Sequence, residues 1–271
     1  MTARPLPPPV APDERPAAPP FAEAAGHVFL RQAAATVRGK RALVAVLLAS
    51  LPVVVTLVQR DDQSIGLVRV IVQMVLPFLV PVVAISLGSG LIYDEAEEGT
   101  LTYLVTSPVS RSSILLGKWC AALAVGWTVL LLSLSAVLLS TPVDLAPHGR
   151  FVRASYYAIA IGYPAYLGVC AFLGTLVRRG FIACLIYAFG YELILSVIPG
   201  AAKRLSVGHF LRSLVYPHSP AKEPFEGTFE NFPPDSETTC LAVLLSVAIA
   251  FVAASLLIAR NKEFQSRNVQ G

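Results

Sequence analysis

Six long apolar stretches constrain this chain more than any other feature of its sequence. A helix rises about 1.5 Å per residue, so roughly 20 apolar residues cross a hydrocarbon core about 30 Å thick. Strands of a membrane barrel would instead alternate over segments of about ten residues. The stretches therefore predict an all-α membrane protein, with a six-helix transmembrane domain over residues 42–260. The predicted spans are 42–58, 68–93, 114–139, 155–177, 181–198 and 241–259.

The composition supports a lipid environment. Of the 271 residues, 55% are hydrophobic and only 14% are charged, whereas a soluble domain has about a quarter of its residues charged. The net charge of +4 comes from Lys and Arg beside the spans, so no nucleic-acid partner is expected. The four cysteines match no zinc or disulfide spacing, and we interpret them as small core residues.

The two ends of the chain differ from its centre. Residues 1–20 are rich in proline and have no apolar core, which predicts a disordered cytoplasmic tail and not a secretory signal. Apolar residues at helical spacing over 21–41 predict an amphipathic helix in the membrane interface; an extension of the first span is the alternative. Residues 261–271 are a predicted cytoplasmic tail.

Basic residues set the predicted orientation. More Lys and Arg lie beside the spans on one side if both termini are cytoplasmic. The sequence therefore predicts a multi-pass protein of the cell (inner, cytoplasmic) membrane, with residues 199–239 forming a long external loop. The first half of that loop has a helical apolar pattern, which predicts interfacial or re-entrant helices before the sixth span.

A polar segment, 94–112, lies between the second and third spans. It begins with four carboxylates, on Asp94, Glu95, Glu97 and Glu98. Anions at a helix C-terminus oppose the helix dipole, so they are better explained by a cationic partner surface or by a new helix start. Gly99 permits a sharp turn and Thr100 can cap a short helix. Solvated loop residues are the simpler alternative. A metal site is not supported, because no His or Cys lies nearby.

The residues of this segment resemble those of a known family. Glu95-x-Glu97-x-Gly99-Thr100-Leu101, Pro108-Val109-Ser110-Arg111 and Leu116-Gly117-Lys118 are similar to the cytoplasmic signature of type-2 ABC transporter permeases. The resemblance implies that 94–112 holds a cytoplasmic coupling helix that docks on a separate ATPase, and that residues 177–180 make a second, smaller contact. The implied docking residues are Glu95, Glu97, Glu98, Gly99, Thr100 and Arg111.

The chain contains no GxxxxGK[ST] phosphate-binding loop, so we expect no enzyme activity and no cofactor of its own. ATP and Mg would be bound by the partner ATPase. The resemblance therefore implies the permease subunit of an exporter, paired with a second permease copy as a homodimer or heterodimer. A membrane assembly or maturation factor using the same fold, and a scaffold that transports nothing, are the alternatives.

Glu192 is the one carboxylate well inside a predicted span. Counting from Gly180 places it about 18 Å along the helix, past the midplane. Intramembrane carboxylates are costly and face a protein interior or an aqueous cavity. Glu192 is therefore a candidate intramembrane polar site, either in a translocation path or as a structural tie to the external helices. Its predicted partners are Lys203, Arg204, or a hydroxyl of Tyr157 or Tyr191.

Overall fold

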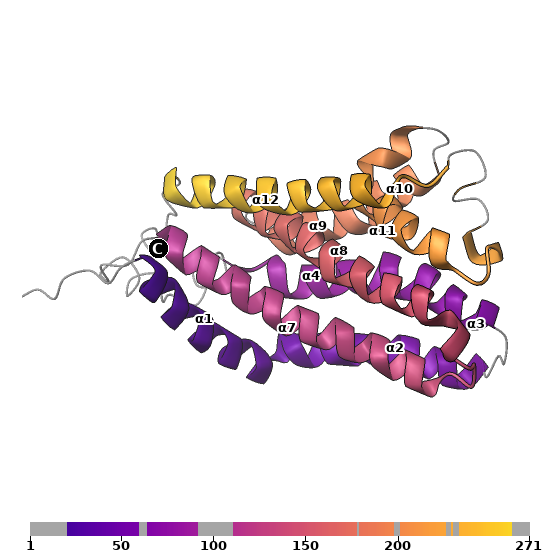
Figure 1. Ribbon diagram of the computed structural model, residues 1–271. Coiled ribbons are helices and arrows are strands. Elements are labelled where there is room, and N and C mark those ends of the chain that lie inside the picture. Colours follow the sequence, from indigo (N-terminus) through magenta and orange to yellow (C-terminus); the bar gives the residue numbers. More distant parts are fainter. Residues whose placement is uncertain are drawn as a thin grey trace, which may run out of the picture.

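A computed structural model describes residues 21–59, 64–91, 111–177, 179–197, 201–225, 229 and 233–261. These residues form helices and connections and no β-strand, so the all-α prediction is confirmed for this part of the chain. The helices run along one bundle (Figure 1). We call the end where α4 (Val80–Gly88) and α8 (Gly149–Leu176) stop and α7 (Arg111–Ser140) and α9 (Gly180–Leu185) begin the α4–α7 end. The other end, at α3 (Ser64–Arg69), is the α3 end.

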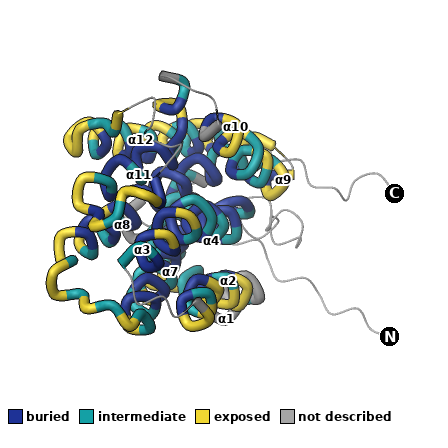
Figure 2. Tube along the Cα trace, turned by 90° about the vertical axis from the view of Figure 1, so that its right-hand side faces the viewer, coloured by how far each residue is buried: buried dark blue, intermediate teal, exposed yellow. Residues whose placement is uncertain are grey.

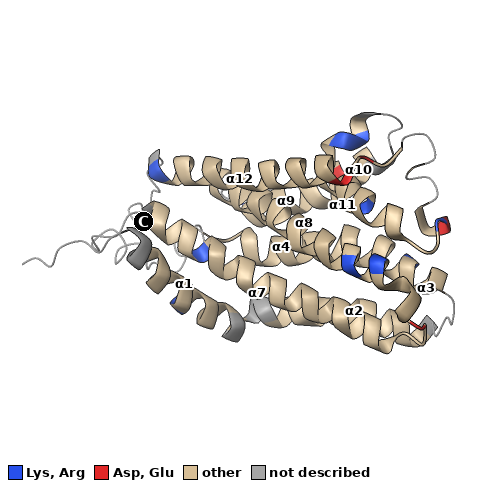
Figure 3. Cartoon of the chain, viewed as in Figure 1, with Lys and Arg blue, Asp and Glu red and all other residues tan. Residues whose placement is uncertain are grey.

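Four helices in the described part are long and apolar enough to cross a membrane, over Ser64–Gly88, Ser112–Ser140, Ala146–Leu176 and Glu237–Arg260. The other two predicted spans correspond to shorter apolar helices, Leu43–Val58 and Gly180–Leu195. Most charged residues of the described part lie toward the two ends of the bundle, and its middle has few of them (Figure 3).

The first half of the chain forms three long helical stretches. A helix, α1 (Phe21–Arg38), is followed by Gly39 and then by α2 (Lys40–Gln59). The predicted amphipathic range 21–41 is therefore divided, and its last residues begin α2. The next stretch consists of α3 (Ser64–Arg69), the π-helix η2 (Val70–Leu79) and α4 (Val80–Gly88). It begins earlier than the predicted span 68–93. The third stretch is α7 (Arg111–Ser140).

The second half contains two long helices and a broken one. The 3₁₀ turn η3 (Ala146–His148) leads into α8 (Gly149–Leu176), which starts six residues before the predicted span. Next come α9 (Gly180–Leu185), the π-helix η4 (Ile186–Tyr191) and α10 (Glu192–Val197). Short helices follow, before α12 (Glu237–Asn261). They are η5 (Ala201–Leu205), α11 (Val207–Val215), η6 (Tyr216–His218) and η7 (Glu223–Phe225).

Helix α8 lies at the centre of the bundle and packs against α4, α7, α9, α11 and α12. Seen along the bundle axis, the buried residues gather around α4, α8 and α11, and the exposed ones lie on the outer faces (Figure 2). Three glycines of α8 admit close neighbours. A Cβ at Gly162 would lie 2.1 Å from Leu211 of α11, one at Gly168 3.1 Å from the Ala248 carbonyl of α12, and one at Gly174 2.4 Å from the Ser89 carbonyl.

Hydrogen bonds between helices fix α7 against its neighbours. Tyr163 of α8 donates its hydroxyl to the Ala122 carbonyl at 2.8 Å, and its ring lies against Gly126. Trp127 donates from Nε1 to the Ala160 carbonyl at 3.1 Å. Ser133 donates to the Ala49 carbonyl of α2 at 2.6 Å. In an apolar solvent, such bonds and close packing at small residues replace the hydrophobic effect as the force between helices.

Helix α1 packs along the first half of α7. The contact is close at Gly117, where a Cβ would lie 2.5 Å from the Ala25 carbonyl and 3.0 Å from the Cβ of Val28. A larger residue at 117 would therefore push α1 away from α7. The glycine of the Leu116-Gly117-Lys118 motif thus has a packing role at the α4–α7 end of the bundle.

Candidate functional site

The predicted docking residues Glu95, Glu97, Glu98, Gly99 and Thr100 lie outside the described residues. Arg111 begins α7, but only its backbone is described. The docking role of these residues therefore stays a prediction. The structure does describe the residues on both sides of this segment, which are the end of α4 and the start of α7, together with the predicted second contact at 177–180.

Lys118 connects the two sides of the segment. Its Nζ donates to the Leu91 carbonyl at 3.0 Å, and its side chain is buried. Leu91 lies in the turn that follows α4, three residues beyond its last helical residue, Gly88. Lys118 therefore holds the turn after the second apolar helix against α7. The sequence carries no local signal for this bond, because Leu91 and Lys118 are 27 residues apart.

The same end of α4 contacts the turn between α8 and α9. The Ser89 carbonyl oxygen would lie 2.4 Å from a Cβ at Gly174 and 2.7 Å from one at Gly180. Real Cβ atoms do not approach a backbone oxygen so closely, so both positions require glycine for this packing. The structure thus places Gly180, the first residue of α9, directly beside the residues that lead into the predicted coupling segment.

Glu192 lies at the start of α10 and is buried. Its carboxylate accepts hydrogen bonds from the backbone N–H groups of Val207 and Gly208, at 2.9 and 3.1 Å. It also accepts from the hydroxyls of Tyr187, at 3.1 Å, and Ser206. Four donors therefore surround this carboxylate. Two of them are the first N–H groups of α11, where the helix dipole favours a negative charge.

The site around Glu192 lies deep in the bundle. The Cβ position of Gly208 is 3.1 Å from Glu192 Oε2 and 3.4 Å from the hydroxyl of Tyr166, which is on the central helix α8. Leu211, one turn later in α11, packs on Gly162 near the middle of α8. The chain after α10 therefore folds back so that α11 starts beside Glu192. This geometry ties the broken helix α9–α10 to α11.

The predicted tyrosine partners of Glu192 were wrong. Tyr191 donates instead to the Leu205 carbonyl, at 3.4 Å, and Tyr157 lies on the outside of α8, 64% exposed. Arg204 pairs with Asp235. The observed partners depend on the turn that brings Ser206 back beside Glu192, and the hydropathy of the sequence carries no signal for that turn.

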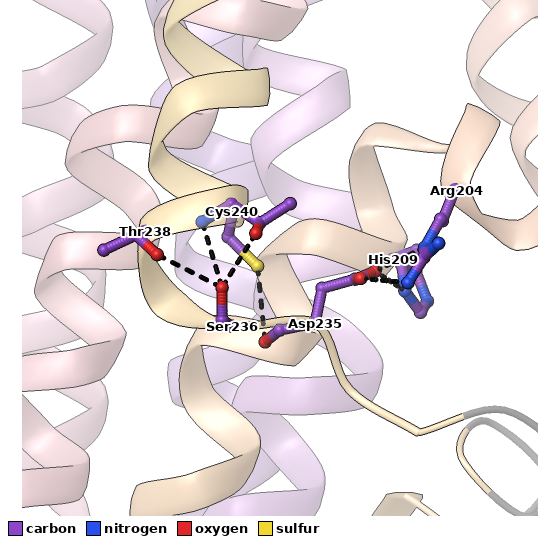
Figure 4. Close-up of polar contacts among 7 residues, drawn as sticks. Arg204, His209, Asp235, Ser236, Thr238 and Cys240 are labelled. Carbon is purple, nitrogen blue, oxygen red and sulfur yellow. Dashed lines mark hydrogen bonds and ion pairs between the residues drawn. The ribbon is translucent and has the colours of Figure 1, made fainter.

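A second polar cluster, Arg204–Asp235–His209, lies at the α3 end between η5, α11 and the start of α12 (Figure 4). Arg204 binds both carboxylate oxygens of Asp235, with Nη2 2.6 Å from Oδ1 and Nε 3.2 Å from Oδ2. His209 Nε2 lies 3.0 Å from Asp235 Oδ2. An ionised carboxylate only accepts hydrogen bonds, so Nε2 carries the proton. His209 and Asp235 are 26 residues apart, so the sequence carries no local signal for this contact.

Asp235 also fixes the start of α12. The next residue, Ser236, caps the helix: its Oγ lies 3.3 Å from the Thr239 backbone N and 2.7 Å from the Thr239 hydroxyl (Figure 4). A serine at this position satisfies an N–H group that has no partner within the helix. The cluster and the cap together attach the first turn of α12 to the helices that precede it.

The charges of the Arg204–Asp235–His209 cluster depend on one another. Burial alone would raise the pKa of Asp235, but the hydrogen bonds from Arg204 and His209 outweigh it and hold that pKa below its usual value. Burial lowers the pKa of His209, and the bond to Asp235 opposes this only in part. The positive charges of Lys203 and Arg204 lower it further. His209 is therefore neutral near pH 7.

Among the described residues, no three His, Cys, Asp or Glu side chains come together in a group that could hold a metal ion. The carboxylates of the two polar sites accept hydrogen bonds from within the chain. Both connect helices of the α3 end, and neither presents a nucleophile beside a general base. The described geometry is that of a membrane bundle with fixed helix contacts at both ends.

We expect Glu192→Leu to destabilise the protein by about 1–3 kcal/mol, because two backbone N–H groups of α11 lose their acceptor in a buried site. Glu192→Gln keeps an acceptor oxygen and should cost less. Glu237→Gln, at the exposed first turn of α12, is the matched control. Thermal unfolding of the purified variants in detergent micelles measures the difference. Equal stability of Glu192→Leu and Glu237→Gln would contradict the role of Glu192.

The cluster also predicts a pH dependence. Folded His209 has a lowered pKa, so the unfolded chain takes up its proton first, below about pH 6.5. Stability should therefore fall as the pH drops from about 7.5 to 5. Asp235, whose pKa is also lowered, contributes to the stability of the folded state as well, and that contribution is lost only below about pH 4.

His209→Gln should reduce the fall of the melting temperature between about pH 7.5 and 5, because glutamine keeps a donor for Asp235 but does not titrate. His218→Gln, at an exposed position on η6, is the control and should retain the wild-type fall. A pH dependence of His209→Gln equal to that of wild type would assign the titration to another group.

Comparison with known proteins accords with this architecture. Residues 27–263 match the protein family described as "ABC-2 family transporter protein". The match begins within α1 and covers all the membrane-capable helices of the described part. No curated protein matches the chain in sequence. The resemblance to type-2 ABC transporter permeases is thereby confirmed, and this chain belongs to the ABC-2 family of transporter proteins, as a membrane-spanning component.

Proposed function

We propose that this chain is the permease subunit of an exporter that is driven by ATP hydrolysed on a separate subunit. The family supplies the membrane component of a transporter, and the sequence has no phosphate-binding loop with which to use ATP itself. The observation that carries the proposal is the position of the polar segment 94–112. It joins two long apolar helices at the end of the bundle where Lys118 fixes them together.

The proposed topology has six crossings with both termini in the cytoplasm. Four crossings are the long helices, and α2 and α9–α10 would be the other two. The 20 residues of α2 extend about 30 Å, and the 18 residues of 180–197 extend about 27 Å, near the thickness of a hydrocarbon core. The α4–α7 end would then face the cytoplasm, with 94–112 and 177–180 beside an ATPase.

Two copies of the permease would form the complete pathway. The described part of a single chain packs its helices tightly around α8 and keeps large apolar side chains on its outside. Many of these exposed side chains lie on α2, on α9–α10 and on α12, and they include Leu47, Val54, Ile186, Leu193 and Ile249. Apolar faces of this kind fit lipid or a second permease equally well. A path between two copies would need no opening through one tightly packed bundle.

If 94–112 docks on an ATPase, that ATPase should bind the wild-type chain and should bind less well when 94–112 is altered. A separate ATP-binding protein should co-purify with the wild-type chain from its native membrane, identified by mass spectrometry. In the double variant Glu97→Lys, Arg111→Glu, at least tenfold less of it should remain, because two charges of the docking segment are reversed. Arg150→Glu, Glu223→Lys reverses two exposed charges at the α3 end and is the matched control.

Each result of this experiment separates the candidate functions. Retention by the control and loss from the docking variant support the proposal. A wild-type chain that brings down no ATP-binding protein contradicts it and favours a scaffold. If the partner is present, stimulation of its ATP turnover by added membrane extract indicates transport. A turnover that nothing stimulates favours an assembly or maturation role with the same partner.

A further inference from the structure

Three parts of the chain meet at the last residues of α4. A Cβ at Gly88 would lie 2.9 Å from Leu167 Cδ1 and 3.0 Å from Cys170 Cβ, so the end of α4 lies directly on α8. One residue later, the Ser89 carbonyl lies between Gly174 and Gly180. Two residues further on, the Leu91 carbonyl accepts from Lys118 of α7. We call this contact region the α4 junction.

The α8–α9 turn closes the α4 junction on its other side. A Cβ at Gly180 would lie 2.6 Å from the Cα of Gly174, so the end of α8 and the start of α9 are in backbone contact. Cys184 of α9 also donates its thiol to the Cys170 carbonyl of α8, at 3.6 Å. The turn at 177–180 is thus held on α8 and on the end of α4 together.

The contacts of the α4 junction leave the helix ends little room to move relative to one another. Backbone against backbone contacts at glycine have no side-chain rotamers through which they can adjust, and packed interiors transmit displacement with little compression. The Lys118 bond adds a charge-assisted link in a buried site, where hydrogen bonds are stronger than in water. The ends of α4, α7, α8 and α9 therefore behave as one body over these residues.

We propose that Lys118, Gly174 and Gly180 are positioning residues that make the α4 junction a rigid joint, so that the described residues flanking the 92–110 and 177–180 connections change position together. The proposal rests on the proposed function in one respect: an ATP-binding subunit supplies the displacement. A force on either connection then reaches α4, α7, α8 and α9 at once. A displacement at either cytoplasmic contact therefore also displaces the other, so the two contacts do not act on the bundle independently.

The spacing of the two connections tests this joint directly. Nitroxide labels are attached at Ser112, in the first turn of α7, and at Val177, which is exposed at the end of α8. A non-canonical ketone side chain carries each label, so the four native cysteines stay unmodified. Pulsed electron paramagnetic resonance then gives the distribution of label distances in lipid nanodiscs. It is recorded for the chain alone and for the complex with its co-purified subunit, without nucleotide and with ATP and vanadate.

The joint predicts one narrow distribution, with the same centre in every state of the wild type. Gly174→Ala and Lys118→Met should each broaden it at least twofold, and Gly180→Ala provides a second glycine variant. Lys118→Arg, which keeps a cationic donor, should restore a narrow distribution. The matched controls are Gly149→Ala on α8, where an added Cβ meets no atom within 4 Å, and Thr128→Val on α7, whose hydroxyl bonds only within its own helix.

Two results would overturn the joint. One is a wild-type distance that changes between the nucleotide-free and vanadate states, because the two connections would then move separately. The other is a set of junction variants whose distributions match the controls. The measurement on the chain alone decides between the variants even if no ATP-binding subunit co-purifies. The joint and the proposed function can thus fail independently.

Discussion

The arrangement of the bundle depends on the glycines of α8. Gly162, Gly168 and Gly174 follow one another at intervals of six residues, and six residues are about one and two-thirds turns of an α-helix. Successive glycines therefore point in directions about 120° apart. Each direction receives a different neighbour: Leu211 of α11 at the first, the backbone of α12 at the second and the Ser89 carbonyl beyond α4 at the third. One helix thus holds three others at close range, in a solvent where apolar surface alone does not draw helices together.

The two ends of the helix bundle are stabilised by different interactions. At the α4–α7 end, a buried lysine and close backbone contacts join α4, α7 and the α8–α9 turn. At the α3 end, carboxylates do the joining: Glu192 accepts from the first N–H groups of α11, and Asp235 connects Arg204 and His209 beside the start of α12. Each buried charge has partners supplied by the chain, as the cost of an unpaired charge away from water requires.

Much of this fold could be predicted from apolar length, and the exceptions have physical causes. Each predicted span overlaps a helical stretch, because a long apolar stretch in lipid must form hydrogen bonds between its own backbone groups. The start of α8 was placed six residues late, because exposed polar residues such as Arg150 continue the helix beyond the apolar run. Pro77 lies within the helix Ser64–Gly88, in its π-helical part, where hydropathy gives no sign of the wider turns. The burial of Glu192 could be expected from the cost of a carboxylate inside an apolar stretch, but its hydrogen-bond partners could not. The contacts of Lys118 and of His209 join residues more than 25 positions apart, and no periodicity records them.

If the chain is a permease driven by a separate ATPase, it would receive its energy at the α4–α7 end. Electron cryomicroscopy of the chain, purified from its native membrane into lipid nanodiscs without chemical crosslinking, shows directly what binds there. We expect an ATP-binding subunit seated against the 92–110 and 177–180 connections, with the contacts of Gly162 and Gly174 on α8 kept. A subunit bound at the α3 end, or a particle in which the α4–α7 end contacts nothing but solvent and lipid, would contradict it.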